Sequence, residues 1–313
     1  MASDPSNQSD EPLHLQPKVT IWTFGGIRGV NLSSDHTDLT ASFCLAKPND
    51  FLLSARSEQV MSRDECKDAA SVPAYLVYKS RQSVFRDSKQ RNHSVEVWHN
   101  GLMAFQVLKP IQTLGFVFQG FETASLTLNL ETTIRRGPMD SGEWARMRTF
   151  DSELLARVPD MIQKISRVME GNNAEHKNSI ILLQLALEQT HPLIAGMLCV
   201  MGMEARFDSS DRNQFKKRLC DCLGSSTLAF PDWNSPYSPR PKYTVEELAI
   251  PLYTLRSKLA HGVDLRKASL DKTAPIDLVK KVELIPQLEP RAHALLLSEA
   301  AYYLLCQVLQ ECL

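Results

Sequence analysis

The segment LYTLRSKLAHGVDL, residues 252–265, carries an arginine and a histidine near the expected end of a helix, where Gly262 can take the left-handed conformation that terminates it. Five residues of α-helix turn through about 500°, which leaves Arg256 and His261 roughly 140° apart and about 7.5 Å along the axis. The two side chains do not share a helix face. A long arginine and fraying at Gly262 nevertheless allow both to border one cleft.

These residue types suit a phosphate ligand. The partial negative charge at a helix C-terminus favours a protonated imidazole, so we expect His261 to titrate near neutrality as an acid–base group. Arg256 offers a planar fork to a phosphate, and Lys258, Arg266 and Lys267 make the neighbourhood basic. The same pattern also fits a purely structural interpretation, in which the arginine forms a salt bridge and the histidine complements the helix dipole.

The C-terminal part, residues 141–313, has helical patterning. Asp151 is a capping residue before a helix that Pro159 should kink or restart. Residues 178–207 are strongly apolar, with a break or kink expected at Pro192, and are predicted to lie in the centre of a bundle. Further helices are predicted from 211 to Gly224, from a Thr-x-x-Glu capping box at 244–247 to about His261, and from 290 to the C-terminus. We expect an all-α bundle of four or five helices.

The N-terminal part is predicted to be mainly antiparallel β, so the fold class is α+β. Residues 1–16 are polar and are expected to be a disordered tail, and strand-like runs fill residues 17–140. Asn100-Gly101 suits a type I′ turn and predicts a β-hairpin over residues 93–108. The glycine-rich stretch 24–29 predicts a tight turn after the first strand, and the basic stretch 79–93 a solvated loop or edge strand.

The composition of the chain indicates its charge, its cellular compartment and the kinds of site it can form. The chain has 313 residues, 43% of them hydrophobic, and Lys+Arg 35 against Asp+Glu 36 leaves a net charge of -1, so any basic site is local. With no apolar run of membrane-spanning length and no signal-peptide pattern, we expect a cytoplasmic protein. The seven scattered cysteines are interpreted as free thiols, and the dispersed histidines predict neither a metal site nor a cofactor.

The segment 252–262 resembles the R-x4-6-H signature of the HEPN superfamily, and especially its Apea-like branch, where a tyrosine, an Arg-Ser pair and a His-Gly pair recur in this arrangement. Residues 202–207 and the helix after them are also similar to that branch, and the resemblance runs from residue 152 to the C-terminus. It implies a HEPN-like helical bundle, often a homodimer, in which paired motifs meet. Many members are metal-independent endoribonucleases of toxin–antitoxin and antiviral defence systems.

The resemblance implies cleavage of RNA by transesterification at the 2′-hydroxyl. His261 would move the proton, Arg256 would stabilise charge on the phosphorane, and Ser257 would orient the phosphate or the arginine. Ser257 stands where active members often carry Asn, Asp or His. The residues expected to bind substrate are Tyr253, Lys258, Arg266, Lys267 and Glu204. Glu204 is also a candidate to orient Arg256, and its structural alternatives are a surface carboxylate or an ion-pair partner.

Two other functions fit the sequence. The helical part would instead be a non-catalytic HEPN module that binds nucleotide or RNA or forms dimers, in keeping with family members that have lost cleavage. The β-rich part would regulate or target a nuclease, with an antitoxin or regulatory partner, or bind carbohydrate or peptide on its own.

Overall fold

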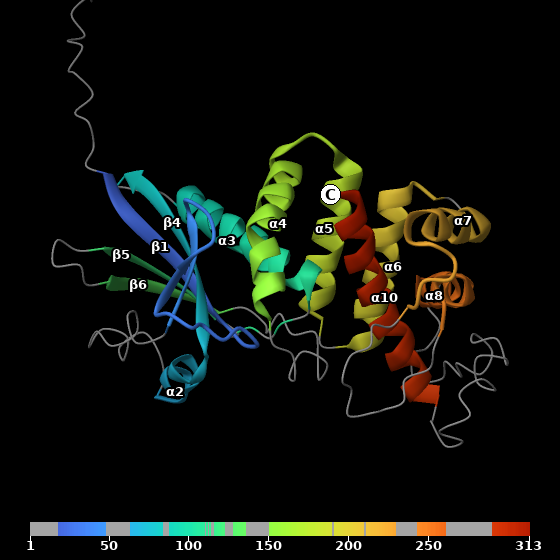
Figure 1. Cartoon of the computed structure of the whole chain (residues 1–313), viewed down its shortest axis with the longest axis horizontal. Coiled ribbons are helices and arrows are strands. Elements are labelled where there is room, and N and C mark those ends of the chain that lie inside the picture. Colours follow the sequence, from blue (N-terminus) through green and yellow to red (C-terminus); the bar gives the residue numbers. More distant parts are fainter. Residues whose placement is uncertain are drawn as a thin grey trace, which may run out of the picture.

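The computed structural model of the chain contains an antiparallel sheet followed by a stack of helices (Figure 1). It describes residues 18–47, 63–83, 88–109, 111, 113, 116–122, 128–135, 150–189, 191–209, 211–229, 243–260 and 290–313. The expected tail and the expected boundary near residue 140 lie outside these ranges. The α+β class, with the strands in the N-terminal part and most helices in the C-terminal part, is confirmed.

The sheet has six strands in the order β2-β3-β4-β1-β5-β6, and every neighbouring pair is antiparallel. The strands are β1 (Lys18–Ile27), β2 (His36–Asp38), β3 (Phe43–Ala46), β4 (Ala74–Ser83), β5 (Phe116–Glu122) and β6 (Leu128–Arg135). Residues 24–27 of the glycine-rich stretch belong to β1, and the chain bends after the strand at the last residue of the stretch, Gly29, whose φ is 85°. Among the described strands, residues 79–83 continue β4 and pair with β1 on one side only, beyond the part of β4 that pairs with β3, so this part of the basic stretch is strand with a free edge. Residues 88–93 are helical rather than loop or strand.

The predicted hairpin at Asn100-Gly101 is wrong, because these residues lie inside helix α3 (Ser88–Leu108). Val95, Trp98 and Leu102 are buried at helical spacing, and the second half of α3 is buried on all sides. Gly101 serves close packing rather than a turn, since a Cβ at this position would clash with the ring of Phe43 on β3. The burial of this half of the helix thus overrides the local turn preference.

Helix α3 joins the sheet to the helical stack. On one side the indole nitrogen of Trp98 donates to the carbonyl of Leu76 in β4 at 2.8 Å. On the other side Tyr302 in the last helix, α10 (Pro290–Cys312), donates its hydroxyl to the carbonyl of Gln106 at 3.0 Å. One hydrophobic core therefore runs from the inner sheet face through α3 into the helices. On the other sheet face, Ala69 of α2 (Arg63–Ser71) packs in a second, smaller hydrophobic cluster. Figure 1 shows α2 near the lower end of β4.

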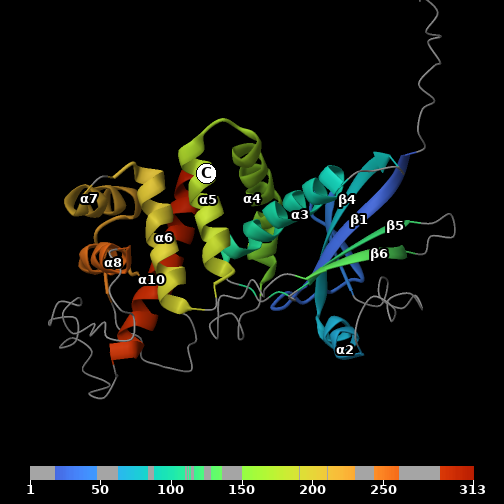
Figure 2. The same cartoon turned by 180° about the vertical axis from the view of Figure 1, so that it is seen from behind.

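The helical stack follows the sequence expectations closely. Besides α10 it contains α4 (Ser152–Glu170), α5 (Ala174–Leu187), α6 (Pro192–Phe207), α7 (Arg212–Leu223) and α8 (Val245–Ala260), six helices in the described part of residues 141–313 rather than four or five. Asp151 caps α4, Pro192 begins α6, and Gly224, with φ 86°, ends α7, as predicted. Pro159 does not interrupt α4, which continues across it. Figure 2 shows α7 and α8 at the end of the stack farthest from the sheet. No described helix is long and apolar enough to cross a membrane.

Candidate functional site

Helix α8 carries the candidate residues and is fixed at its N-terminus by the predicted capping box. The backbone nitrogen of Thr244 donates to the Glu247 carboxylate at 2.9 Å, and the Glu247 nitrogen donates to the Thr244 hydroxyl at 3.3 Å. Leu248, Leu252 and Leu255 are buried along one stripe of the helix, which sets its rotation. Arg256 follows Leu255, the last residue of this stripe, and is partly buried at the edge of the buried face.

Arg256 forms a close ion pair with Glu204 of α6. Its Nε lies 2.7 Å from a carboxylate oxygen of Glu204, and the two side chains are 30% and 10% exposed. The Nε is itself buried and makes no well-aligned hydrogen bond, so the contact is one of opposite charges rather than an ideal fork. Among the described residues, no other carboxylate contacts the guanidinium.

Burial also changes the acidity of Glu204. Desolvation raises the pKa of the Glu204 carboxyl above its ordinary value, and the opposing effect of Arg256 only partly offsets it. The Glu204 side chain is therefore not a surface carboxylate, and it is an ion-pair partner, of Arg256. Glu204 thus orients the guanidinium from beneath.

An aromatic contact supports Arg256 from its own helix. The guanidinium carbon lies 5.7 Å from the ring centroid of Tyr253, one turn earlier on α8. The Tyr253 ring in turn packs against Phe215 of α7, with the ring centroids 5.7 Å apart. Tyr253 therefore has a structural contact on one side and Arg256 on the other.

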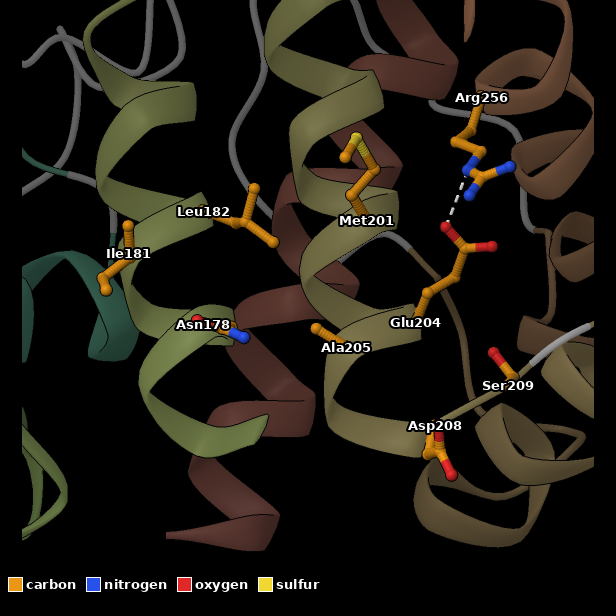
Figure 3. A pocket seen from close by; sticks show the side chains of 9 residues that line it. All are labelled: Asn178, Ile181, Leu182, Met201, Glu204, Ala205, Asp208, Ser209 and Arg256. Atoms are coloured by element: carbon orange, nitrogen blue, oxygen red, sulfur yellow. Dashed lines mark ion pairs between the residues drawn. The ribbon is translucent and has the colours of Figure 1, made fainter. Parts of the chain in front are cut away.

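Arg256 and Glu204 lie on the wall of an open pocket of about 460 Å³, shown in Figure 3. The α5 wall consists of Asn178, Ile181 and Leu182, opposite Arg256 across α6. The remaining lining residues are Met201, Glu204, Ala205, Asp208 and Ser209. The described lining carries two carboxylates and one guanidinium, so a polyanion would need further positive charge from outside this set.

The other predicted site residues are only partly described. Ser257 follows Arg256 on α8 and is half-buried, but it is not among the residues that line the pocket. Lys258 belongs to α8, although its side chain lies outside the described part of the structure. His261, Gly262, Arg266 and Lys267 also lie outside it. The structure thus brings together Arg256, Glu204 and Tyr253, and the pairing of Arg256 with His261 stays a prediction.

The sequence did not indicate the α5 wall of the pocket. Residues 178–207 were expected in the centre of the bundle, but Ile181 and Leu185 are 39% and 40% exposed, so one face of α5 is at the surface. Their spacing of four residues would have indicated a shared helix face, although not which way it points. We found no match to this chain among models of protein families, curated proteins or solved structures.

Proposed function

We propose that the chain is a metal-independent endoribonuclease of the HEPN type, which cleaves RNA by attack of the 2′-hydroxyl on the adjacent phosphate. The observation that carries the proposal is the position of Arg256: its side chain is 30% exposed on a pocket wall, held by Glu204 beneath it and Tyr253 beside it. A guanidinium fixed in this way loses little further freedom on binding a phosphate.

The chemistry divides between two groups. His261 takes the proton of the 2′-hydroxyl or supplies one to the leaving 5′-oxygen, and Arg256 stabilises the negative charge that develops on the phosphorane. Ser257 orients the phosphate or the arginine. The products are a 2′,3′-cyclic phosphate and a free 5′-hydroxyl, so atoms and protons balance without a metal ion.

The charge of the described pocket sets a requirement on this mechanism. Glu204 neutralises Arg256, and Asp208 adds a negative charge to the lining. RNA binding therefore depends on Lys258, Arg266 and Lys267 for the positive charge that attracts its backbone. Replacing these three with glutamine should weaken RNA binding and reduce its dependence on salt concentration, whereas Arg256→Ala should abolish cleavage.

Because HEPN motifs work in pairs, we propose that two copies associate through the helical part. Ile181 and Leu185 form an exposed apolar strip on α5, beside the pocket, of the kind that a second copy would bury. Mass measurement over a concentration series tests this point. A dimer that Ile181→Asp dissociates supports it, and a strict monomer at high concentration argues against a shared active site.

The second candidate function is a non-catalytic module that binds nucleotide or RNA, or only forms dimers. The ion pair favours it, because a buried Glu204 gives Arg256 a structural partner without any substrate. An RNA cleavage assay distinguishes the two functions, with purified protein incubated with mixed RNAs in the presence of EDTA. Cleavage lost in both Arg256→Ala and His261→Ala, with the fold intact, supports the nuclease; unchanged RNA with retained partner binding supports the module.

We also propose that the N-terminal sheet regulates or targets this activity, in a toxin or anti-phage context with an antitoxin-like partner. The continuous core through α3 supports such coupling, because α3 packs against the sheet through Trp98 and contacts α10 through the hydrogen bond from Tyr302 to Gln106. The test compares RNA cleavage by the unchanged chain and by Tyr302→Phe, each with and without the partner. If the coupling runs through this contact, the partner should change the two cleavage rates by different factors.

A further inference from the structure

A second group of chemically active side chains lies far from the pocket, where the edge strand β2 pairs with β3. In this antiparallel pair Asp38 is directly opposite Cys44. His36 and Asp38 are two residues apart on one strand, so their side chains point to the same sheet face as Cys44. The strand register thus brings together an imidazole, a carboxylate and a thiol from the nine residues 36–44, which form one hairpin.

The three groups are close enough to share one ion. One ligand atom from each of His36, Asp38 and Cys44 lies within 4.8 Å of the others, and His36 Nε2 is 2.7 Å from Asp38 Oδ1. Zinc binds nitrogen, oxygen and sulfur at about 2.0–2.3 Å, so tetrahedral spacing requires the His36–Asp38 contact to open by roughly 1 Å or less. That shift is accessible, since these side chains are 41% and 77% exposed.

An ion-binding site requires ligands that solvent can reach, and two of these three residues are exposed while the third is buried. Cys44 is 1% exposed and lies beside Asp38 on the neighbouring strand β3, on the sheet face that packs against α2. An ion can therefore reach the sulfur from the solvent side, past the exposed His36 and Asp38. Three protein ligands leave one tetrahedral position for water.

We propose that His36, Asp38 and Cys44 bind a single zinc ion. The ion replaces the thiol proton of Cys44, which passes to solvent, and bonds form from zinc to the thiolate sulfur, an imidazole nitrogen of His36 and a carboxylate oxygen of Asp38. No oxidation or reduction takes place. This site is separate from the proposed nuclease, which needs no metal.

Lys79 on β4 supports the thiolate in this site. Val77 pairs with Cys44, and Lys79 is two residues further on the same face. Burial raises the pKa of the Cys44 thiol, while the charge of Lys79 and its hydrogen bond to the thiol oppose that rise and Asp38 adds to it. Lys79 also lies 4.6 Å from the ring centroid of Trp22, which holds it in place. It acts as an outer partner that orients the sulfur ligand.

The test uses the full chain with Co²⁺ as the spectroscopic probe and Zn²⁺ as the competitor. We expect one Co²⁺ per chain, a thiolate-to-cobalt charge-transfer band, and loss of that band when Zn²⁺ is added. Cys44→Ser should abolish the band, and His36→Ala and Asp38→Asn should each weaken binding by about tenfold or more. Cys66→Ser, on α2 at the same sheet face, is the matched control and should leave the spectrum unchanged.

Folding of each variant is checked by thermal unfolding in chelator, where the exposed His36→Ala and Asp38→Asn changes should match the unchanged chain. An absorption spectrum without the charge-transfer band overturns the proposal. So does a single bound ion that both His36→Ala and Cys44→Ser retain, or a band that disappears in the Cys66→Ser control.

Discussion

The Nε of Arg256 lies 2.7 Å from the carboxylate of Glu204, and this contact joins helix α8 to helix α6 at the wall of the pocket. The contact fixes the position of the Arg256 guanidinium beside the open pocket. Two separate consequences follow, one for stability and one for the pH dependence of stability.

The first prediction is that Arg256 and Glu204 are energetically coupled. Removing Arg256 leaves a largely buried carboxylate without its counter-charge, so Arg256→Met should reduce the free energy of unfolding by about 1–3 kcal/mol. Glu204→Gln should change it less, because the cost of burying the Glu204 carboxylate offsets part of the ion pair. The double variant should lose less than the sum, with a coupling of about 0.5–3 kcal/mol by denaturant unfolding. Lys216, which pairs with Glu246 at the surface, supplies the control, because Lys216→Met should change little. Additive losses would contradict the coupling.

The second prediction concerns pH. Burial raises the pKa of Glu204, so the folded chain keeps a proton that the unfolded chain releases near its ordinary value of 4.5. The stabilising contribution of this group is complete below that value and is lost as pH rises through the raised folded pKa. The free energy of unfolding of the unchanged chain, minus that of Glu204→Gln, should therefore fall as pH rises above 4.5. A difference that rises with pH would mean that Arg256 outweighs burial.

The third prediction tests helix α3 against the hairpin that its turn residues suggest. Gly101→Ala should reduce the free energy of unfolding by about 1–3 kcal/mol, because the added methyl overpacks against Phe43. The same change in a Phe43→Leu background should cost less, measured by denaturant unfolding. Asn100→Ala should stay within about 0.5 kcal/mol, as expected for a helix and not for a type I′ turn. A large loss in Asn100→Ala would favour the hairpin.

The fourth prediction concerns the start of α8. Thr244→Ala removes the hydroxyl that accepts from the Glu247 nitrogen and should reduce the free energy of unfolding by about 1 kcal/mol. Thr244→Ser keeps that hydroxyl and serves as the control. Equal loss in both variants would show that the methyl group of Thr244, rather than the cap, supports α8.

Much of the helical part could be predicted from local sequence, since Asp151, Pro192, Gly224 and the Thr244 capping box each determine a helix end through the backbone groups next to them. Helix α3 could not be predicted in the same way. Asn100-Gly101 has the local preference of a turn, and only the burial of residues 101–108 between sheet and bundle selects a helix.

The candidate sites depend on tertiary structure in the same manner. Glu204 and Arg256 are 52 positions apart, and the proximity of α6 and α8 brings them together. Cys44 joins His36 and Asp38 because of strand register, which dispersed histidines and cysteines in a sequence do not reveal. Residue type alone suggested what each side chain can do, and packing decided which of them meet.

The proposed endoribonuclease activity is tested most directly by the chemistry of the RNA ends. Purified chain is incubated with defined RNAs in the presence of EDTA, and the termini of the products are mapped, with Arg256→Ala, His261→Ala and the neutral Lys216→Met as matched variants. We expect 2′,3′-cyclic phosphate and 5′-hydroxyl ends from the unchanged chain and from Lys216→Met, and none from Arg256→Ala or His261→Ala. Intact RNA in every case, or cleavage that survives in folded Arg256→Ala, would contradict the proposal.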